Sequence, residues 1–172
     1  MNQTHLHLMM VHLPIFGSMI GAFVLIQGIW SKSDTVKMAS YSVFILSCLG
    51  AIIAYLSGES AEKSVEDLPG VLEYTIHRHE EFATYALAVF TVLGLASIVG
   101  FFLTMGKSSM ARMYSYMVLL IALVSFGISS RTGYLGGQIR HTELHDAKSS
   151  GQNISPNDAS SSNSDEQEEE ED

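Results

Sequence analysis

Histidines are the residues of this chain best suited to chemistry, and every one of them borders an apolar segment. The seven are His5, His7, His12, His77, His79, His141 and His145. An imidazole nitrogen can ligate haem iron or a metal ion, and it can also form a hydrogen bond between helices. A histidine at the edge of a membrane costs solvation unless it stays in water or has a partner. What these side chains can do therefore depends on which segments enter the membrane.

Four apolar stretches predict an integral membrane protein. They cover residues 8–30, 38–57, 81–104 and 113–135. Each has about the 20 residues that a helix needs to cross a hydrocarbon core of roughly 30 Å, and none has a polar face that recurs at helical spacing. The first stretch is too long for the apolar region of a signal peptide and lacks a basic leader. We therefore predict an all-α fold, an integral membrane four-helix bundle within residues 1–146.

The segments outside these stretches differ in composition. In the connection 58–79, Gly58 is expected to stop the second helix, and SAEKSVEDL (60–68) is expected to form a short amphipathic helix before a Pro-Gly pair. The next residues, 71–82 (VLEYTIHRHEEF), are expected to extend the third helix into the membrane interface. Residues 147–172 are rich in Ser and Asn and then acidic, which predicts a disordered tail that carries most of the net charge of −9.

Four spans place both termini and the connection 58–79 on one side of the membrane, together with all seven histidines. The two short loops on the other side carry four basic residues and one acid: Lys32, Lys37, Lys107, Arg112 and Asp34. This density of positive charge favours a cytoplasmic position for the short loops. Both termini and the histidines are then expected on the outer side.

Spacing limits which histidines can meet inside the bundle. His7 and His12 are about 140° apart around a helix, so they cannot both face one seam. Pro14 suits the first turn of a helix, which places His12 at the helix entrance and His7 on a more irregular lead-in. His77 and His79 also point apart. Imidazoles from the starts of the first and third helices and the end of the fourth are expected to converge at one depth.

One hypothesis is a small b-type cytochrome, because paired histidines from two helices commonly hold haem. The axial pair would be His12 with His79, or His79 with His141. Arg131 lies inside the predicted end of a span, where a charge is costly without a partner. It is expected to extend to the interface, to pair with Glu59 or Glu80, or to hold an acidic group such as a haem propionate. The candidate haem-binding residues are His7, His12, His79, His141, Arg131 and Arg140.

A second hypothesis is a non-haem copper, zinc or iron site, because imidazole and carboxylate groups suit these metals. Its candidate ligands are His7, His12, His79, His141, Glu59 and Glu80. A third is an accessory subunit of a larger membrane complex, in which the histidines form interhelical hydrogen bonds. The sequence has no nucleophile elbow and no His-Glu-x-x-His motif. An electron-transfer or accessory protein is therefore favoured over a stand-alone enzyme.

Three segments of the chain resemble the bacterial four-helix membrane family filed as domain of unknown function 2231. They are HLHLMMVHLPI, LSGESAEKSVEDLPGVLEYTIHRHEEFA and RTGYLGGQIRH. The positions that match the family's motifs are His7, His12, Pro14, Gly58, Glu59, His79, Glu80, Gly136, Gly137 and His141. Departures occur at Leu8, Gln138 and Thr142, where the family often has proline, an acid and glycine. The resemblance covers residues 5 to about 145.

The resemblance also suggests a cellular setting. Some members of the family are joined to Rieske iron–sulfur domains, which implies redox chemistry at the bacterial inner (plasma) membrane. The expected partners are the lipid bilayer and a Rieske or cytochrome redox protein, or a larger respiratory-type complex; no nucleic-acid partner is expected. Together with the residues, this favours a membrane-embedded redox subunit that binds haem b.

Overall fold

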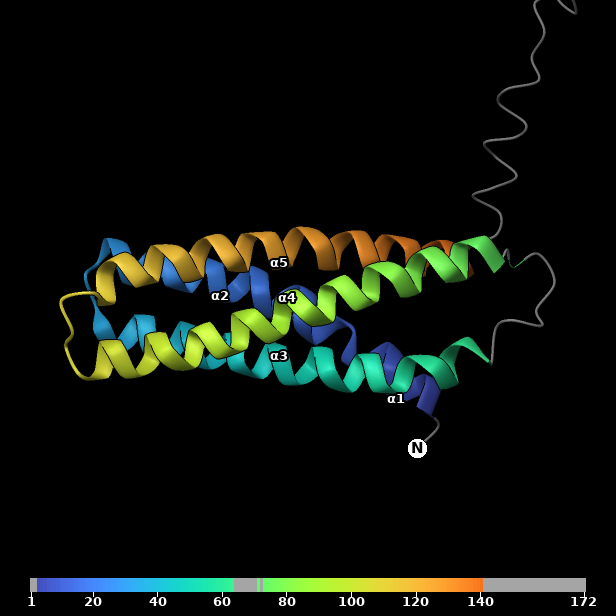
Figure 1. Ribbon diagram of the computed structural model, residues 1–172, viewed down its shortest axis with the longest axis horizontal. Helices are drawn as coiled ribbons and strands as arrows, with labels where there is room; N and C mark the ends of the chain where they lie inside the picture. Colours follow the sequence, from blue (N-terminus) through green and yellow to red (C-terminus); the bar gives the residue numbers. More distant parts are fainter. Residues whose placement is uncertain (1–2, 64–70, 72, 141–172) are drawn as a thin grey trace, which may run out of the picture. The chain divides into compact units, whose positions relative to one another are not determined.

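The computed structural model describes residues 3–63, 71 and 73–140, and within them it contains helices and no strand (Figure 1). The helices are α1 (Gln3–Met10), α2 (His12–Trp30), α3 (Asp34–Glu62), α4 (Glu73–Met105) and α5 (Ala111–Arg140). Four segments are long and apolar enough to cross a membrane: Thr4–Trp30, Asp34–Glu62, Glu73–Met105 and Ala111–Ile139. The predicted all-α bundle with four spans is confirmed. The predicted tail, residues 147–172, lies outside the described residues.

The helices form an antiparallel bundle in which α2 packs on α3 and α5, and α4 packs on α3 and α5. Helix α1 packs against α3. This order brings α1, the end of α3, the start of α4 and the end of α5 together, and we call this the histidine end (Figure 1). The opposite end, formed by residues 31–33 and 106–110, is called the loop end.

Small and polar residues fill the interior, whereas large apolar side chains point outward. Ser18, Ser40, Ser97, Ser115 and Ser125 are all fully buried. Exposed large side chains include Phe23, Leu56, Leu95 and Leu120, each more than 60% exposed. This distribution suits a bundle in lipid, where small residues permit close helix packing and no hydrophobic force holds the helices together.

Most buried serines satisfy their hydroxyl groups on their own helix. Ser47 donates to the carbonyl of Val43 at 2.8 Å, and Ser125 donates to that of Ile121 at 2.8 Å. Ser40 instead donates across to the carbonyl of Gly21 at 3.0 Å and thereby links α3 to α2. In a medium without water these bonds remove the cost of burying the hydroxyl groups.

The lead-in that carries His7 is helical, so the expectation of an irregular segment there was wrong. Pro14 has no N–H, so the carbonyl of Met10 loses its usual helical partner and the helix is interrupted at Val11. Val11 nevertheless keeps helical dihedrals, φ −61° and ψ −25°, and its N–H donates to the carbonyl of His7 at 3.0 Å. The proline therefore breaks the helix locally without unwinding the preceding residues.

Gly58 does not end the second span, which is a further correction. Helix α3 continues to Glu62, so residues 60–62 extend it and do not begin a separate amphipathic helix. The remainder of that predicted helix, residues 64–68, lies outside the described residues. A Cβ atom at Gly58 would lie 3.6 Å from Cε1 of His7, so this glycine faces α1. The predicted extension of the third helix is confirmed, because α4 begins at Glu73.

Glycines let α2 approach α3 closely along most of its length. Gly17 faces Ser47 and Gly21 faces Phe44, and in both places a side chain of α3 fills the space that a larger residue on α2 would need. At Gly28 the neighbour is backbone: an added Cβ would lie 2.9 Å from the main-chain nitrogen of Lys37. Because backbone cannot rotate away as a side chain can, Gly28 marks the tightest constraint on this helix pair.

We expect Gly28→Ala to lower the free energy of unfolding by about 1–3 kcal/mol, since α2 and α3 must separate to admit the methyl group. Gly127→Ala is the matched control, because Gly127 is exposed and an added Cβ meets nothing within 4 Å. The control should leave stability unchanged or raise it by up to about 1 kcal/mol through helix propensity. Thermal unfolding in detergent, followed by circular dichroism, compares the two; equal midpoints would contradict the packing described.

Candidate functional site

Two histidines from different helices lie close together at the histidine end, with the edge of one ring toward the face of the other. His7 of α1 and His79 of α4 have ring centroids 6.5 Å apart, with ring planes inclined at 80°. Both side chains are half-buried, whereas the nearby His5 and His77 are exposed. Of the five histidines in the described residues, His7 and His79 are thus the pair that the fold brings together.

Each of the two rings is held by a backbone carbonyl on a further helix. Nδ1 of His7 lies 2.8 Å from the carbonyl oxygen of Ala54 in α3, and Nδ1 of His79 lies 3.0 Å from that of Thr132 in α5. A carbonyl can only accept, so Nδ1 must carry the proton in both rings. In the neutral imidazole this leaves the lone pair on Nε2, the arrangement that metal-ligating histidines usually show.

A glycine follows each of these carbonyl acceptors by four residues, one helical turn later. Gly58 follows Ala54, and Gly136 follows Thr132. Added Cβ atoms would lie 3.6 Å from Cε1 of His7 and 3.1 Å from Cε1 of His79, respectively. The missing side chains therefore let each ring lie against a helix backbone. The same unit of histidine, carbonyl and glycine occurs once on α1 with α3 and once on α4 with α5.

His12 lies apart from this pair. It is exposed, its Nδ1 donates to the carbonyl of Leu8 in the preceding turn at 2.8 Å, and its ring stacks on Phe16 with centroids 6.2 Å apart. His7 and His12 thus face different directions, as their spacing predicts. His141, the other predicted partner of His79, lies outside the described residues.

The predicted acidic ligands point to solvent or to other partners. Glu59 is exposed and forms an ion pair with Lys63 at 2.8 Å. Glu80 is also exposed. In the part of the chain that the structure describes, no three side chains of His, Cys, Asp or Glu lie close enough to share a metal ion. The donor set there is the pair His7 and His79.

Arg131 is exposed on α5 and is held by aromatic rings. Its guanidinium carbon lies 5.3 Å from the ring centroid of Tyr134 and 5.9 Å from that of Phe82. Such contacts stabilise a cation at a membrane surface without an acidic partner. No ion pair of Arg131 with Glu59 or Glu80 occurs in the structure. The side chain of Arg140 lies outside the described residues.

Thr132 is a residue of the site that the sequence did not indicate. Its carbonyl accepts from His79, and its hydroxyl lies 3.2 Å from the carbonyl of Phe82, so it links α5 to α4 twice. Main-chain acceptors such as Thr132 and Ala54 have no side-chain signature. The sequence signal that accompanies each of these two acceptors is the glycine four residues after it.

Comparison of the chain with family models, with curated proteins and with solved structures gives no match. The resemblance to the four-helix family therefore stays a prediction. Among the motif positions that carry it, Gly58 and Gly136 are those that lie against the two imidazole rings.

The hydrogen bonds to carbonyls predict the tautomers of the two rings. In the neutral form of each ring we expect His7 and His79 to carry the proton on Nδ1, which donates to a carbonyl, whereas exposed His77 should favour the Nε2–H form. Nitrogen-15 chemical shifts of labelled imidazoles distinguish the two forms, with His7→Ala and His79→Ala providing the assignments. Neutral rings that carry the proton on Nε2 and not on Nδ1, in both His7 and His79, would contradict the described arrangement.

Proposed function

We propose that this protein is a membrane-embedded electron-transfer subunit that binds haem b between His7 and His79. The observation that carries the proposal is the pair of facing imidazoles, each with Nδ1–H bonded to a backbone carbonyl. His7 and His79 would hold the haem through Nε2, because Nδ1 of each ring already donates to a carbonyl. Their ring centroids lie 6.5 Å apart.

The size of the donor set favours haem over a bare metal ion. Zinc, copper and non-haem iron sites usually take three or four protein ligands. Haem brings its own porphyrin nitrogens, so two histidines would be sufficient to hold it. The described residues offer the neighbouring His7 and His79 and no third donor grouped with them.

The chain's own residues would prepare the site in three ways. The carbonyls of Ala54 and Thr132 fix the orientation of the rings and raise the basicity of Nε2. The glycines at 58 and 136 let each ring lie against a helix backbone. Arg131, the residue before Thr132, would supply a cation for a propionate in place of its contacts with Phe82 and Tyr134. Bound haem supplies one-electron redox chemistry at this position.

The position of the histidine end at one end of the bundle suggests which partners would exchange electrons with the site. The histidine end lies at one edge of the bundle, so a redox centre there can exchange electrons with a Rieske or cytochrome partner, or within a larger respiratory-type complex. The basic loop end favours a cytoplasmic position for residues 31–33 and 106–110. We accordingly propose a bacterial inner-membrane protein with its histidine end and termini on the periplasmic side.

A purely structural role is the second candidate, and one observation favours it. His7 links α1 to α3, and His79 links α4 to α5, through bonds that need no cofactor. Interhelical hydrogen bonds of this kind stabilise membrane bundles by up to about 1–2 kcal/mol. In that case the protein is an accessory subunit in which the two rings fix the helix positions.

Absorption spectra of the detergent-purified protein, air-oxidised and then dithionite-reduced, separate the two candidates. Haem b bound by two histidines gives a Soret band that shifts on reduction and sharp α and β bands. We expect His7→Ala and His79→Ala each to remove these bands. His77→Ala on the same helix is the matched control, because that side chain is exposed, and it should leave the spectrum unchanged.

Metal analysis of the same samples completes the comparison. The protein must be produced with sufficient haem. A spectrum without visible bands, in a sample without bound metal, would then contradict the haem proposal and support the structural role. Stoichiometric copper, zinc or iron without a Soret band would instead assign a non-haem site. Bands that survive in both alanine variants would show that other residues ligate the haem.

A further inference from the structure

A polar pocket of about 460 Å³ lies at the loop end, opposite the histidine pair. Its lining includes four cationic side chains and one carboxylate: Lys32, Lys37, Lys107, Arg112 and Asp34. They come from both short loops and from the first turns of α3 and α5. The excess of positive charge, together with two helix N-termini, favours an anionic ligand.

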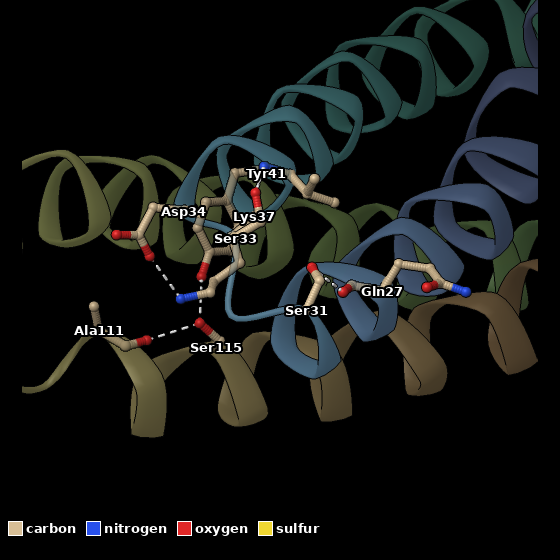
Figure 2. Close-up of polar contacts among 9 residues, drawn as sticks. Gln27, Ser31, Ser33, Asp34, Lys37, Tyr41, Ala111 and Ser115 are labelled. Atoms are coloured by element: carbon tan, nitrogen blue, oxygen red, sulfur yellow. Dashed lines mark hydrogen bonds and ion pairs between the residues drawn. The ribbon is translucent and has the colours of Figure 1, made fainter.

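Only one of these cations is neutralised by the carboxylate. Nζ of buried Lys37 lies 2.8 Å from Oδ1 of Asp34, and Figure 2 shows this pair beside the Tyr41–Ser115 hydrogen bond. The side chains of Lys32, Lys107 and Arg112 have no ion pair within the described part of the chain. The pocket therefore holds uncompensated positive charge.

A buried hydroxyl group in the pocket wall also lacks a partner. Thr104 is 2% exposed and lines the pocket, and its Oγ1 has no hydrogen bond. Leaving such a donor unsatisfied costs about 1–3 kcal/mol. A ligand oxygen that accepts from Thr104 would remove this cost, which makes Thr104 the second, independent indication of a ligand.

The two loops present their lysines in the same unusual backbone conformation. Lys32 has φ 54° and Lys107 has φ 51°. In each loop, the residue after this lysine bonds to the carbonyl five residues earlier: Ser33 to Gly28 and Ser108 to Leu103. Glycine is the usual residue at this position of a helix end, and a side chain there costs about 1 kcal/mol. Both loops thus carry a cation where stability alone favours glycine.

An apolar groove begins where the pocket ends. It has a volume of about 420 Å³ and runs along α4, lined by Ile98, Val99, Phe102, Leu103 and, at its end, Gly106 and Ser108. Ser108 lines both the groove and the pocket. A ligand with a charged head and a hydrocarbon chain fits this pair of surfaces better than a free anion, because the groove faces the lipid.

We propose that the loop end binds an anionic phospholipid, with its phosphate group in the pocket and an acyl chain in the groove on α4. Lys107 and Arg112 pair with the headgroup charge, and Thr104 donates to a headgroup oxygen. Basic pockets between membrane helices bind acidic headgroups in this way. This site is separate from the histidine end and does not depend on the proposed haem.

The test measures thermal unfolding of the full chain in detergent during titration with phosphatidylglycerol, phosphatidylcholine or inorganic phosphate. We expect phosphatidylglycerol to raise the unfolding midpoint and phosphatidylcholine to have little effect. The double variant Lys107→Gln/Arg112→Gln should weaken the apparent affinity about tenfold or more. Lys63→Gln/Arg78→Gln removes the same charge at the histidine end and should bind as the unchanged protein does.

Thr104→Val separates ligand binding from simple packing. Without lipid it should raise the unfolding midpoint, because it removes an unsatisfied buried hydroxyl group; with phosphatidylglycerol its lipid-dependent rise should be smaller than that of the unchanged protein. Equal rises with phosphatidylglycerol and phosphatidylcholine, or equal losses in the two double variants, would overturn the proposal. Protection by inorganic phosphate as strong as that by phosphatidylglycerol would assign a soluble phosphate and overturn the lipid.

Discussion

Close approach of helix backbones is the constraint on which this bundle depends. In lipid, apolar side chains gain little by leaving the membrane, so helices associate through tight packing and a few polar links. The chain meets this requirement with glycine: Gly17, Gly21 and Gly28 bring α2 onto α3, and Gly100 admits the ring of Tyr41. The histidine end uses the same device, because Gly58 and Gly136 leave room for imidazole rings beside helix backbones.

Local properties of the sequence were sufficient to predict the four spans. Length and apolar composition alone distinguish a membrane helix, and the structure extends each span without changing its place. The errors occurred where a distant contact overrides a local signal. Gly58 has the composition of a helix stop, yet it lies within α3 beside His7. Pro14 interrupts one hydrogen bond and leaves the preceding residues helical, which the sequence does not reveal.

The candidate site was predictable as a set of histidines but not as a particular pair. Angular spacing separates His7 from His12 and His77 from His79, and it correctly implies that only one of each couple can face a given seam. Which one does so depends on the rotation of each helix about its own axis. In the structure His7 and His79 are the ones that turn inward, and each hydrogen-bonds to a main-chain carbonyl, a group that every residue possesses.

The duplicated unit of histidine, carbonyl and glycine has a consequence for how the protein is assembled. His7 belongs to the helical hairpin formed by α1, α2 and α3, and His79 belongs to the hairpin of α4 and α5. Each hydrogen bond links two helices of one hairpin, because the imidazole and the carbonyl that accepts from it lie in the same half of the chain. The rings meet only when the hairpins dock. The pair of His7 and His79 therefore forms only after both hairpins have packed together, and neither half of the chain alone contains it.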